Sequence, residues 1–559
     1  MSSIPDLKSA AALVDQTNLL PFKKLLIVFF SLGLCLVSTS LDSLIVAMVL
    51  PTITTAFNAG TIISWVPSAY LLASTGFQPL YRRFSDIFGR KAALMGAMIL
   101  FMIRNMIAGF SKLINQLIAA CTISGAGGGG VLSLCQIITA DIVPLSRRGK
   151  YQGLVGTISA LGYTIGPVIG GPLAEKVSWR WCFWVTIPIA FVATVVLLVA
   201  APLKSIQGGA MKKLRVIDYG GVLLSLAACT LILLPLIWGG VTYPWTSSHV
   251  LGTLITGFFV AVAFCLYEWK AAKLPIVPMY LFRNVTIVGV YVSMFVNGFV
   301  FFSSIYYIPQ YLQTVFGFSP VRTGVYLIAL LIGQMITSWH SGELVTRTGR
   351  YRVSFLWLKI LILKYFPALD LLWLCDVKPL LIVFSLFAGI GAGQTLQTTT
   401  VAAQASVAKR DVGVVTAFRS FIRLLGGALS LAIGSTIINN SLTKALSQVS
   451  LPPSVTMAII QKPAILAHPS QIGVSQADAS FILSHGYTYG FRNLFIVNAS
   501  WAAFATVISA SLIKQINLSG DDETIRQSPS EEQTQIGEES SQNGDQGYGK
   551  NEIKVENMA

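Results

Sequence analysis

The apolar runs of this chain contain few charged residues, and those few are where chemistry is possible. Asp42 is the only acidic residue in the first run, which begins near Leu25. On a helical rise of 1.5 Å per residue, Asp42 lies about 25 Å from the start of that run. A carboxyl at this depth in a membrane helix could exchange a proton as its access to water alternates. The alternative is a structural carboxyl that is hydrogen-bonded to a neighbouring helix.

Three arginines also lie within apolar runs, where a cation is costly unless it is paired or hydrated. Arg104 is in the third run. It is either a functional cation within the membrane or a side chain that reaches back to the interface. Arg419 and Arg423 are four residues apart, so they share one helix face. They either line a cavity or hold neighbouring helices together.

A short segment with charges of both signs separates the second and third runs. Residues 85–91 read SDIFGRK and follow two further arginines, so this segment belongs at a water interface. A weaker copy at residues 342–350, GELVTRTGR, follows the tenth run. We expect these segments to form a gate at one end of the molecule. The candidate gate residues are Asp86, Gly89, Arg90, Lys91 and Arg350.

The composition places these residues in a membrane protein. Hydrophobic residues make up 54% of the 559, only 11% are charged, and the mean hydropathy is +0.69. Soluble domains have about a quarter of their residues charged, and a membrane helix needs about 20 apolar residues. We therefore expect an all-α membrane protein with about fourteen transmembrane helices. They begin near Leu25, Ile63, Ala92, Leu113, Gly153, Trp181, Val216, Val250, Val285, Gly324, Val353, Leu380, Val412 and Arg492.

Basic residues alternate loop by loop, and this pattern predicts the orientation. The loops after even-numbered runs are basic, for example Arg147-Arg148-Gly149-Lys150, whereas those after odd-numbered runs hold mostly single charges. Basic loops face the cytosol, which places both termini there as well. The net charge of +16 is therefore largely a topology signal. A nucleic-acid-binding protein would gather its charges on one face, so we expect no nucleic-acid partner.

The runs divide into two groups of six with two further helices between them, and we expect a monomer. The expected parts are a cytosolic segment at 1–24, an N-terminal half at 25–203, linking helices and loops at 204–284, a C-terminal half at 285–518 with an outer loop at about 441–490, and a disordered acidic cytosolic tail at 519–559.

The fifth run contains glycines at a spacing of four. Gly162, Gly166 and Gly170 lie on one face of the helix, where they permit close approach of another backbone. Pro167 removes a backbone donor and allows a bend, and Gly171 ends the motif.

These motifs resemble those of the major facilitator superfamily. The segment SDIFGRK looks like its cytosolic loop signature, and the run from Gly162 to Gly171 is similar to the signature of its proton-driven antiporters. LDSLIV at 41–46 resembles the first-helix motif of the fourteen-helix drug:proton antiporter family, and QAS at 404–406 resembles its fungal branch. That branch includes multidrug and toxin exporters and vacuolar basic amino-acid transporters. The resemblance implies a major facilitator fold of two six-helix halves plus two extra helices.

The chain departs from the family pattern in the fourth run. The family has an arginine, thought to assist proton coupling, where Cys121 stands here. Arg104 is about as far as Cys121 from the turn near Lys112, roughly 13 Å along antiparallel helices. The cation could therefore have moved to the neighbouring helix. The family also usually has a glycine at the position of Arg82.

The resemblance implies an antiporter that exports drugs, toxins or other amphipathic compounds by alternating access, coupled to protons. A vacuolar basic amino-acid transporter is one alternative. A non-transporting membrane sensor is another, motivated by the missing fourth-run arginine. We expect a plasma-membrane or vacuolar location, no cofactor or metal and no enzyme activity. The sequence contains no phosphate-binding Gly-x-x-x-x-Gly-Lys-Ser/Thr loop and no catalytic motif.

Overall fold

The computed structural model is built almost entirely from helices. It describes residues 21–57, 62, 65–200, 218–239, 243–272, 275–351, 378–449, 451–452, 455–456, 458–459, 466 and 474–516. The eleventh expected run, near Val353, lies outside these residues, as do the expected acidic tail and most of the expected N-terminal segment. Within the described part, the one β-type contact is an isolated bridge between Gly239 and Tyr243.

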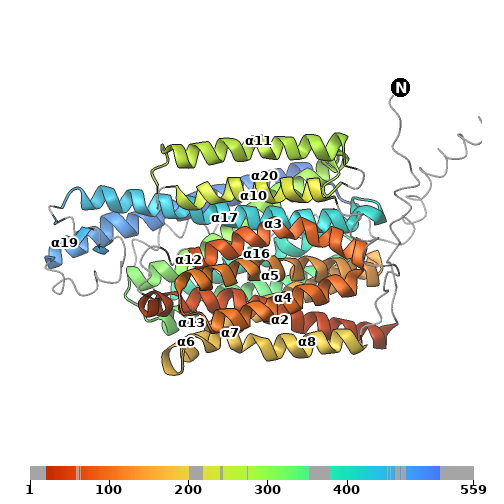
Figure 1. Cartoon of the computed structure of the whole chain (residues 1–559), viewed down its shortest axis with the longest axis horizontal. Coiled ribbons are helices and arrows are strands. Elements are labelled where there is room, and N and C mark those ends of the chain that lie inside the picture. The colour runs from red at the N-terminus through yellow and green to blue at the C-terminus, as the bar shows by residue number, and fades with distance from the viewer. Residues whose placement is uncertain are drawn as a thin grey trace, which may run out of the picture.

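The N-terminal half is a bundle of long helices (Figure 1). Its elements are α2 (Phe22–Phe57), α3 (Trp65–Phe88), α4 (Arg90–Gly109), α5 (Ile114–Ile142), α6 (Leu145–Lys176), α7 (Trp181–Trp184) and α8 (Thr186–Ala200). Gly89 separates α3 from α4 at a φ of 98°, a backbone conformation that glycine adopts without strain.

The two linking helices lie at the edge of the bundle. Helix α10 (Tyr219–Trp238) packs against α3 and α11 (Ser248–Lys270), and α11 forms the outermost layer in Figure 1. Large apolar side chains on α11 are exposed, including Ile255, Phe258 and Phe259. A lipid-facing helix has this composition, because bilayer tails solvate apolar side chains.

The C-terminal half repeats the helical pattern. Its elements are η2 (Met279–Arg283), α12 (Val285–Thr314), α13 (Pro320–Thr348), α16 (Lys378–Ala405), η3 (Lys409–Asp411), α17 (Val412–Leu446), α19 (Gln476–Phe481), the π-helical segment η6 (Ile482–Thr488) and α20 (Tyr489–Leu512). The same kinds of pairs pack in both halves: α2 with α6 and α3 with α5 in the first, α12 with α17 and α13 with α16 in the second.

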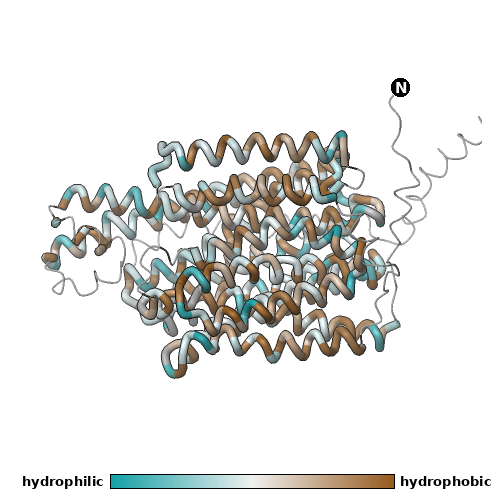
Figure 2. Tube along the Cα trace, in the orientation of Figure 1, coloured by the Kyte–Doolittle hydropathy of each residue, from teal (hydrophilic) through white to brown (hydrophobic). Residues whose placement is uncertain are grey.

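Eleven of the described helices are long and apolar enough to cross a membrane. Figure 2 shows their hydrophobic middles, with hydrophilic residues towards the ends of the bundle. Helices α3 and α13, expected as the second and tenth spans, are equally long but more polar. Buried polar residues on α3, such as Thr75 and Gln78, face other helices instead of lipid.

The end of the chain differs from the expected boundaries. The last span was expected near Arg492, after an outer loop at about 441–490. Helix α17 instead continues to Leu446, and helical structure resumes at Gln476 and runs through η6 into α20. Both extensions project beyond the rest of the bundle (Figure 1). Polar residues such as Gln476, Asp478 and His485 interrupt the apolar ones at 476–488, so no continuous apolar run marks this helix.

Candidate functional site

Asp42 and Arg104 form an ion pair inside the N-terminal half. Arg104 Nη2 lies 2.5 Å from Asp42 Oδ2, and Nη1 lies 3.1 Å from Oδ1, so the contact is bidentate. Both side chains are only 1% exposed. The pair joins the middle of α2 to the second half of α4. A bidentate arginine–carboxylate contact combines charge with fixed geometry, so it holds both side chains in one arrangement.

The surroundings of Arg104 are polar on one side and aromatic on the others. Nη1 also donates to the Asn105 side-chain oxygen at 2.7 Å. The guanidinium carbon lies 5.8 Å from the ring centre of Phe101 and 5.5 Å from that of Phe183. Among the residues that the structure describes, Arg104 Nε has no hydrogen-bond partner. The cation therefore depends on Asp42 for its one negative charge at contact distance among the described residues.

This geometry decides between the two interpretations of Arg104. A side chain that reaches back to the interface would be exposed at its tip, whereas this guanidinium is buried and paired. Cys121 of α5 packs in the apolar cluster that contains Leu41, Ile45 and Phe183, next to the pair. The cation on α4 and the family's arginine position on α5 therefore border the same part of α2. The role of the pair in proton coupling stays a prediction.

The glycine face of α6 packs against α2 on either side of Asp42. A Cβ at Gly162 would lie 2.9 Å from the Val37 carbonyl oxygen, and one at Gly166 would lie 3.3 Å from the Leu41 carbonyl oxygen. A Cβ at Gly170 would lie 2.5 Å from Cγ1 of Ile45. Pro167 faces the other half, where a Cβ at Gly324 of α13 would lie 3.4 Å from it. Gly171, although in the motif, is only half-buried.

Hydroxyl groups occupy the side of α2 that faces α3 and α6. Ser43 Oγ lies 3.0 Å from the Tyr70 hydroxyl, and Ser40 lies beside Tyr163. Tyr306 of α12 interacts electrostatically with both tyrosines. Three partly buried tyrosines from both halves therefore lie beside α2. The sequence does not indicate them, since tyrosines are common in membrane helices and their spacing here is not distinctive.

Arg423 of α17 faces these tyrosines from the C-terminal half. Its Nε donates to the Asn297 side-chain oxygen at 3.0 Å, and its guanidinium carbon lies 4.8 Å from the ring centre of Phe301. It interacts electrostatically with Tyr163 of α6. The side chain is 5% exposed, and no carboxylate lies within 4 Å of it among the described residues. A buried cation is thus held by neutral groups alone.

Arg419, one helical turn away, links the two halves instead. Its Nη2 donates to the Gln136 side-chain oxygen of α5 at 2.9 Å, and its Nη1 donates to the Leu396 carbonyl of α16 at 3.2 Å. Gln136 is fixed in turn, because its carbonyl accepts from the Gln152 side chain at 2.9 Å. Of the two interpretations of this arginine, the structure favours one that holds helices together.

The predicted gate residues lie at one end of the bundle, opposite α19 (Figure 1). We call this the basic end and define it as residues 82–91, 145–150, 347–350 and 409–411. Asp86 forms ion pairs with Arg82 and Arg90, and Arg90 Nε also contacts Asp141 of α5 at 2.8 Å. Lys91 donates to the Leu198 carbonyl at 2.8 Å. The gate segment thereby ties α3, α4, α5 and α8 together within one half.

Arg82, which stands where the family has a glycine, also reaches the other half. A Cβ on Gly413, at the start of α17, would collide with the Arg82 side chain. The neighbouring Asp411 accepts a hydrogen bond from the Tyr280 hydroxyl at 2.7 Å. Arg82 therefore contributes to closing the basic end.

The second copy of the gate segment works differently. Gly349 ends α13 at a φ of 64°, and Arg350 beside it is exposed. Thr346, at the position that matches Asp86, accepts a hydrogen bond from the Lys150 backbone of α6 at 2.7 Å. A Cβ at Gly149 would lie 2.8 Å from the Gly342 carbonyl oxygen, so α6 and α13 are in close backbone contact there. The halves are closed against each other at the basic end.

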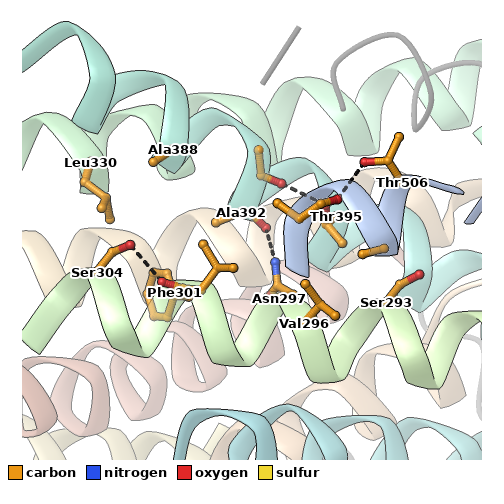
Figure 3. Close-up of a pocket in the computed structure, with 14 residues that line it drawn as sticks. Ser293, Val296, Asn297, Phe301, Ser304, Leu330, Ala388, Ala392, Thr395 and Thr506 are labelled. Atoms are coloured by element: carbon orange, nitrogen blue, oxygen red, sulfur yellow. Dashed lines mark hydrogen bonds between the residues drawn. The ribbon is translucent and has the colours of Figure 1, made fainter. Parts of the chain in front are cut away.

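A pocket lies within the C-terminal half, between α12, α13, α16 and α20 (Figure 3). It is mainly apolar, with hydroxyls from Ser293, Ser304, Thr395 and Thr506. Asn297 and Phe301, which hold Arg423, also line it, and Asn297 donates to the Ala392 carbonyl at 3.1 Å. The described residues contain no group of three or more His, Cys, Asp or Glu side chains that could hold a metal.

Comparison with known proteins gives matches along most of the chain. Residues 30–431 match the family model for the Major Facilitator Superfamily. Citrate exporter 1 of Yarrowia lipolytica is 36% identical over 82% of this chain and 68% of its own length. The efflux pump dotC of Dothistroma septosporum is 34% identical over 78% of this chain and 76% of its own.

Solved transporters share the fold at low sequence identity. A bacterial homologue of the human lysosomal transporter Spinster, in an inward-facing and unoccupied conformation, gives a TM-score of 0.57 at 14% identity and covers 89% of this chain and 100% of its own. The human organic anion transporter MFSD10 gives 0.54 at 14% identity, covering 86% and 100%. The chain is therefore a multi-pass membrane transporter that belongs to the major facilitator superfamily, with fungal efflux pumps among its relatives.

Proposed function

We propose that this protein is a proton-coupled antiporter that exports small molecules by alternating access. The observation that carries the proposal is the buried ion pair between Asp42 and Arg104. In this pair, the acid Asp42 is fully buried on α2, the first helix of the N-terminal half, and its counter-ion Arg104 is on a different helix, α4.

Protonation of Asp42 would change the stability of this arrangement sharply. A neutral Asp42 would leave Arg104 as a buried cation without a counter-charge. Removing one partner of a buried ion pair destabilises a protein by about 3–5 kcal/mol. The energy falls if α2 shifts relative to α4 or if water reaches the guanidinium. Binding a proton at Asp42 therefore favours a different placement of α2. This is the differential interaction that a conformational switch requires.

The glycine face of α6 would pass such a shift of α2 to the interface between the halves. Helix α6 contacts α2 through Gly162 and Gly166 and contacts α13 through Gly149 and Gly153. One stiff helix thus touches both the charged pair and the closed basic end. Rocking of the halves around a fixed site is the expected cycle for paired-repeat transporters.

The direction of transport rests on two arguments. The positive-inside pattern places the basic end, with both chain termini, in the cytosol. The names of the relatives, a citrate exporter and efflux pumps, describe export. Export to the far side of a plasma or vacuolar membrane, driven by proton entry, agrees with both.

The two alternatives fit the site less well. A basic amino acid would carry its positive charge towards Arg423, for which the described residues supply no neutralising carboxylate. A sensor without coupling was motivated by the missing fourth-run arginine, but Arg104 supplies a cation beside the same part of α2.

The test uses purified protein in liposomes that contain a pH-sensitive dye. Citrate, an anion, and rhodamine 6G, an amphipathic cation, serve as probes under an imposed pH gradient. We expect probe flux and proton flux in opposite directions for at least one of them, and loss of both in the Arg104→Ala variant. If neither probe moves protons, or if the variant does so normally, proton-coupled export is contradicted.

A further inference from the structure

Arg423 is the buried charge that the proton-coupling proposal does not use. It lies on α17, which packs closely against α12: a Cβ at Gly298 of α12 would collide with the Arg423 backbone. The side chain is therefore held on a rigid pair of helices. Its position is fixed further by Asn297 and by the rings of Phe301 and Phe302, whose centres lie 4.8 and 5.5 Å from the guanidinium carbon.

The partners of Arg423 leave its charge uncompensated. Asn297 accepts from Nε only, so this hydrogen bond uses one of the five N–H groups of the guanidinium. Aromatic faces attract a cation but do not neutralise it. Within the described part of the chain, Nη1 and Nη2 have no hydrogen-bond acceptor. The pair of Nη groups forms a fork that matches a carboxylate.

The opposite wall supplies further donors. The ring of Tyr163 on α6 lies 6.1 Å from the ring of Phe301, centre to centre, and the guanidinium carbon of Arg423 lies 4.8 Å from that same Phe301 ring. Tyr70 and Tyr306 lie in the same electrostatic cluster. Phenolic O–H groups donate to anions, so the cation and the hydroxyls would act on one negatively charged group from both halves.

We propose that Arg423, with Asn297 and the hydroxyl of Tyr163, forms an anion subsite that selects transported molecules bearing a carboxylate. This inference rests on the proposed transport function and names its substrate class. An organic carboxylate would provide the negative charge that Arg423 lacks, in the way that Asp42 provides it for Arg104. Since the subsite has walls from both halves, its occupancy also affects how the halves close.

Arg419 is excluded from this role by its contacts. Its Nη groups bond to Gln136, Leu396 and the Met294 sulfur, so they are already committed to neighbouring helices. The two arginines on one helix face therefore differ in function: Arg419 holds α5 and α16, and Arg423 is available to a ligand.

The experiment measures equilibrium binding to purified, detergent-solubilised protein with four probes: citrate, benzoate, its neutral analogue benzamide, and lysine. We expect binding of citrate and benzoate to be at least about tenfold tighter than that of benzamide or lysine. Arg423→Gln should weaken carboxylate binding about 10- to 100-fold. Arg423→Lys should retain part of it, because the charge stays and the fork is lost.

Two further variants keep the test decisive. Arg322→Gln is the matched control, since Arg322 is exposed and its guanidinium carbon lies 4.3 Å from the ring centre of Phe318, and this variant should bind the probes normally. Tyr163→Phe removes one hydroxyl and little volume, and it should weaken carboxylate binding several-fold even if Arg423→Gln fails to fold.

Equal binding of benzoate and benzamide to the folded wild type would overturn the proposal. So would normal carboxylate binding by folded Arg423→Gln, or displacement of citrate by chloride at equal concentration. Proton coupling is measured separately, so coupled rhodamine flux without carboxylate selectivity would overturn the subsite alone.

Discussion

The two halves of this transporter differ in how they stabilise a buried arginine. In the N-terminal half, Arg104 is neutralised by Asp42 of the same half, and both are sealed from solvent. In the C-terminal half, Arg419 and Arg423 are equally buried but are held by amides, carbonyls and aromatic rings. A cation with its own carboxylate responds to protons, whereas a cation without one responds to anions. In our proposals, this difference corresponds to proton binding in the first half and recognition of the substrate charge in the second.

The gate segments at the basic end show a related contrast. The first copy forms its ion pairs mainly inside its own half, around Asp86. The second copy has Thr346 at that position and bonds across to Lys150 of the other half. The first copy therefore stiffens one half, and the second closes the two halves together. Both sequence copies keep a glycine with positive φ, Gly89 and Gly349, and each of them lies where a helix ends.

The largest effect is expected when the cation of the N-terminal pair is removed. Arg104→Ala should abolish gradient-driven transport, because Asp42 would then be a buried acid that stays protonated and no longer switches. Adding Cys121→Arg should restore part of the coupling, since Cys121 borders the same part of α2. Proton flux in liposomes checks both. Unchanged coupling in Arg104→Ala would show that the pair is structural.

Gly166→Leu tests whether the close packing of α6 on α2 is needed for the cycle. A Cβ there already meets three α2 atoms at 3.3 Å, so a leucine would push the helices apart and reduce transport by at least about tenfold. Gly252→Leu is the control, since a Cβ on this exposed glycine of α11 meets nothing within 4 Å. If initial transport rates of the two variants are equal, helix contact at Gly166 does not matter for the cycle.

Arg419→Leu tests whether this arginine closes the basic end. Losing its bonds to Gln136 and Leu396 should favour opening by about 1–3 kcal/mol, which is roughly 5- to 150-fold in population. Spin labels at the exposed positions Arg147 and Arg350 would report a new, longer distance. Arg322→Leu should leave the distance distribution unchanged. An unaltered distribution in Arg419→Leu would refute the closing role.

The smallest effect is expected at the surface of the second gate copy. Arg347→Ala removes a 2.8 Å ion pair with Glu343, but the Arg347 side chain is 76% exposed, so the free energy of unfolding should fall by at most about 0.5 kcal/mol. Asp86→Asn, in the buried network of the first copy, should lower it by at least about 2 kcal/mol. Thermal unfolding of the two variants in detergent measures the difference. Equal shifts would contradict the contrast between the copies.

The sequence predicted the helical fold and the family well, because apolar runs and basic loops follow directly from the chemistry of a bilayer. It also identified Asp42 and Arg104 as separate candidates. It could not show that they pair, since this depends on α2 and α4 being adjacent and on side-chain directions. Tyr163 and Asn297 were missed because single hydroxyls and amides in apolar runs have no distinctive spacing. The helix at 476–488 was missed because polar residues interrupt its apolar ones.

Separating exchange from gradient-driven transport tests the central claim most directly. Asp42→Asn keeps the volume of the side chain and an oxygen for Arg104, but it cannot bind and release a proton. If Asp42 carries the proton and Arg423 the substrate charge, this variant should still exchange labelled citrate for unlabelled citrate across a liposome membrane without a gradient. It should no longer concentrate citrate when a pH gradient is imposed. Wild-type accumulation by Asp42→Asn under that gradient would contradict the account.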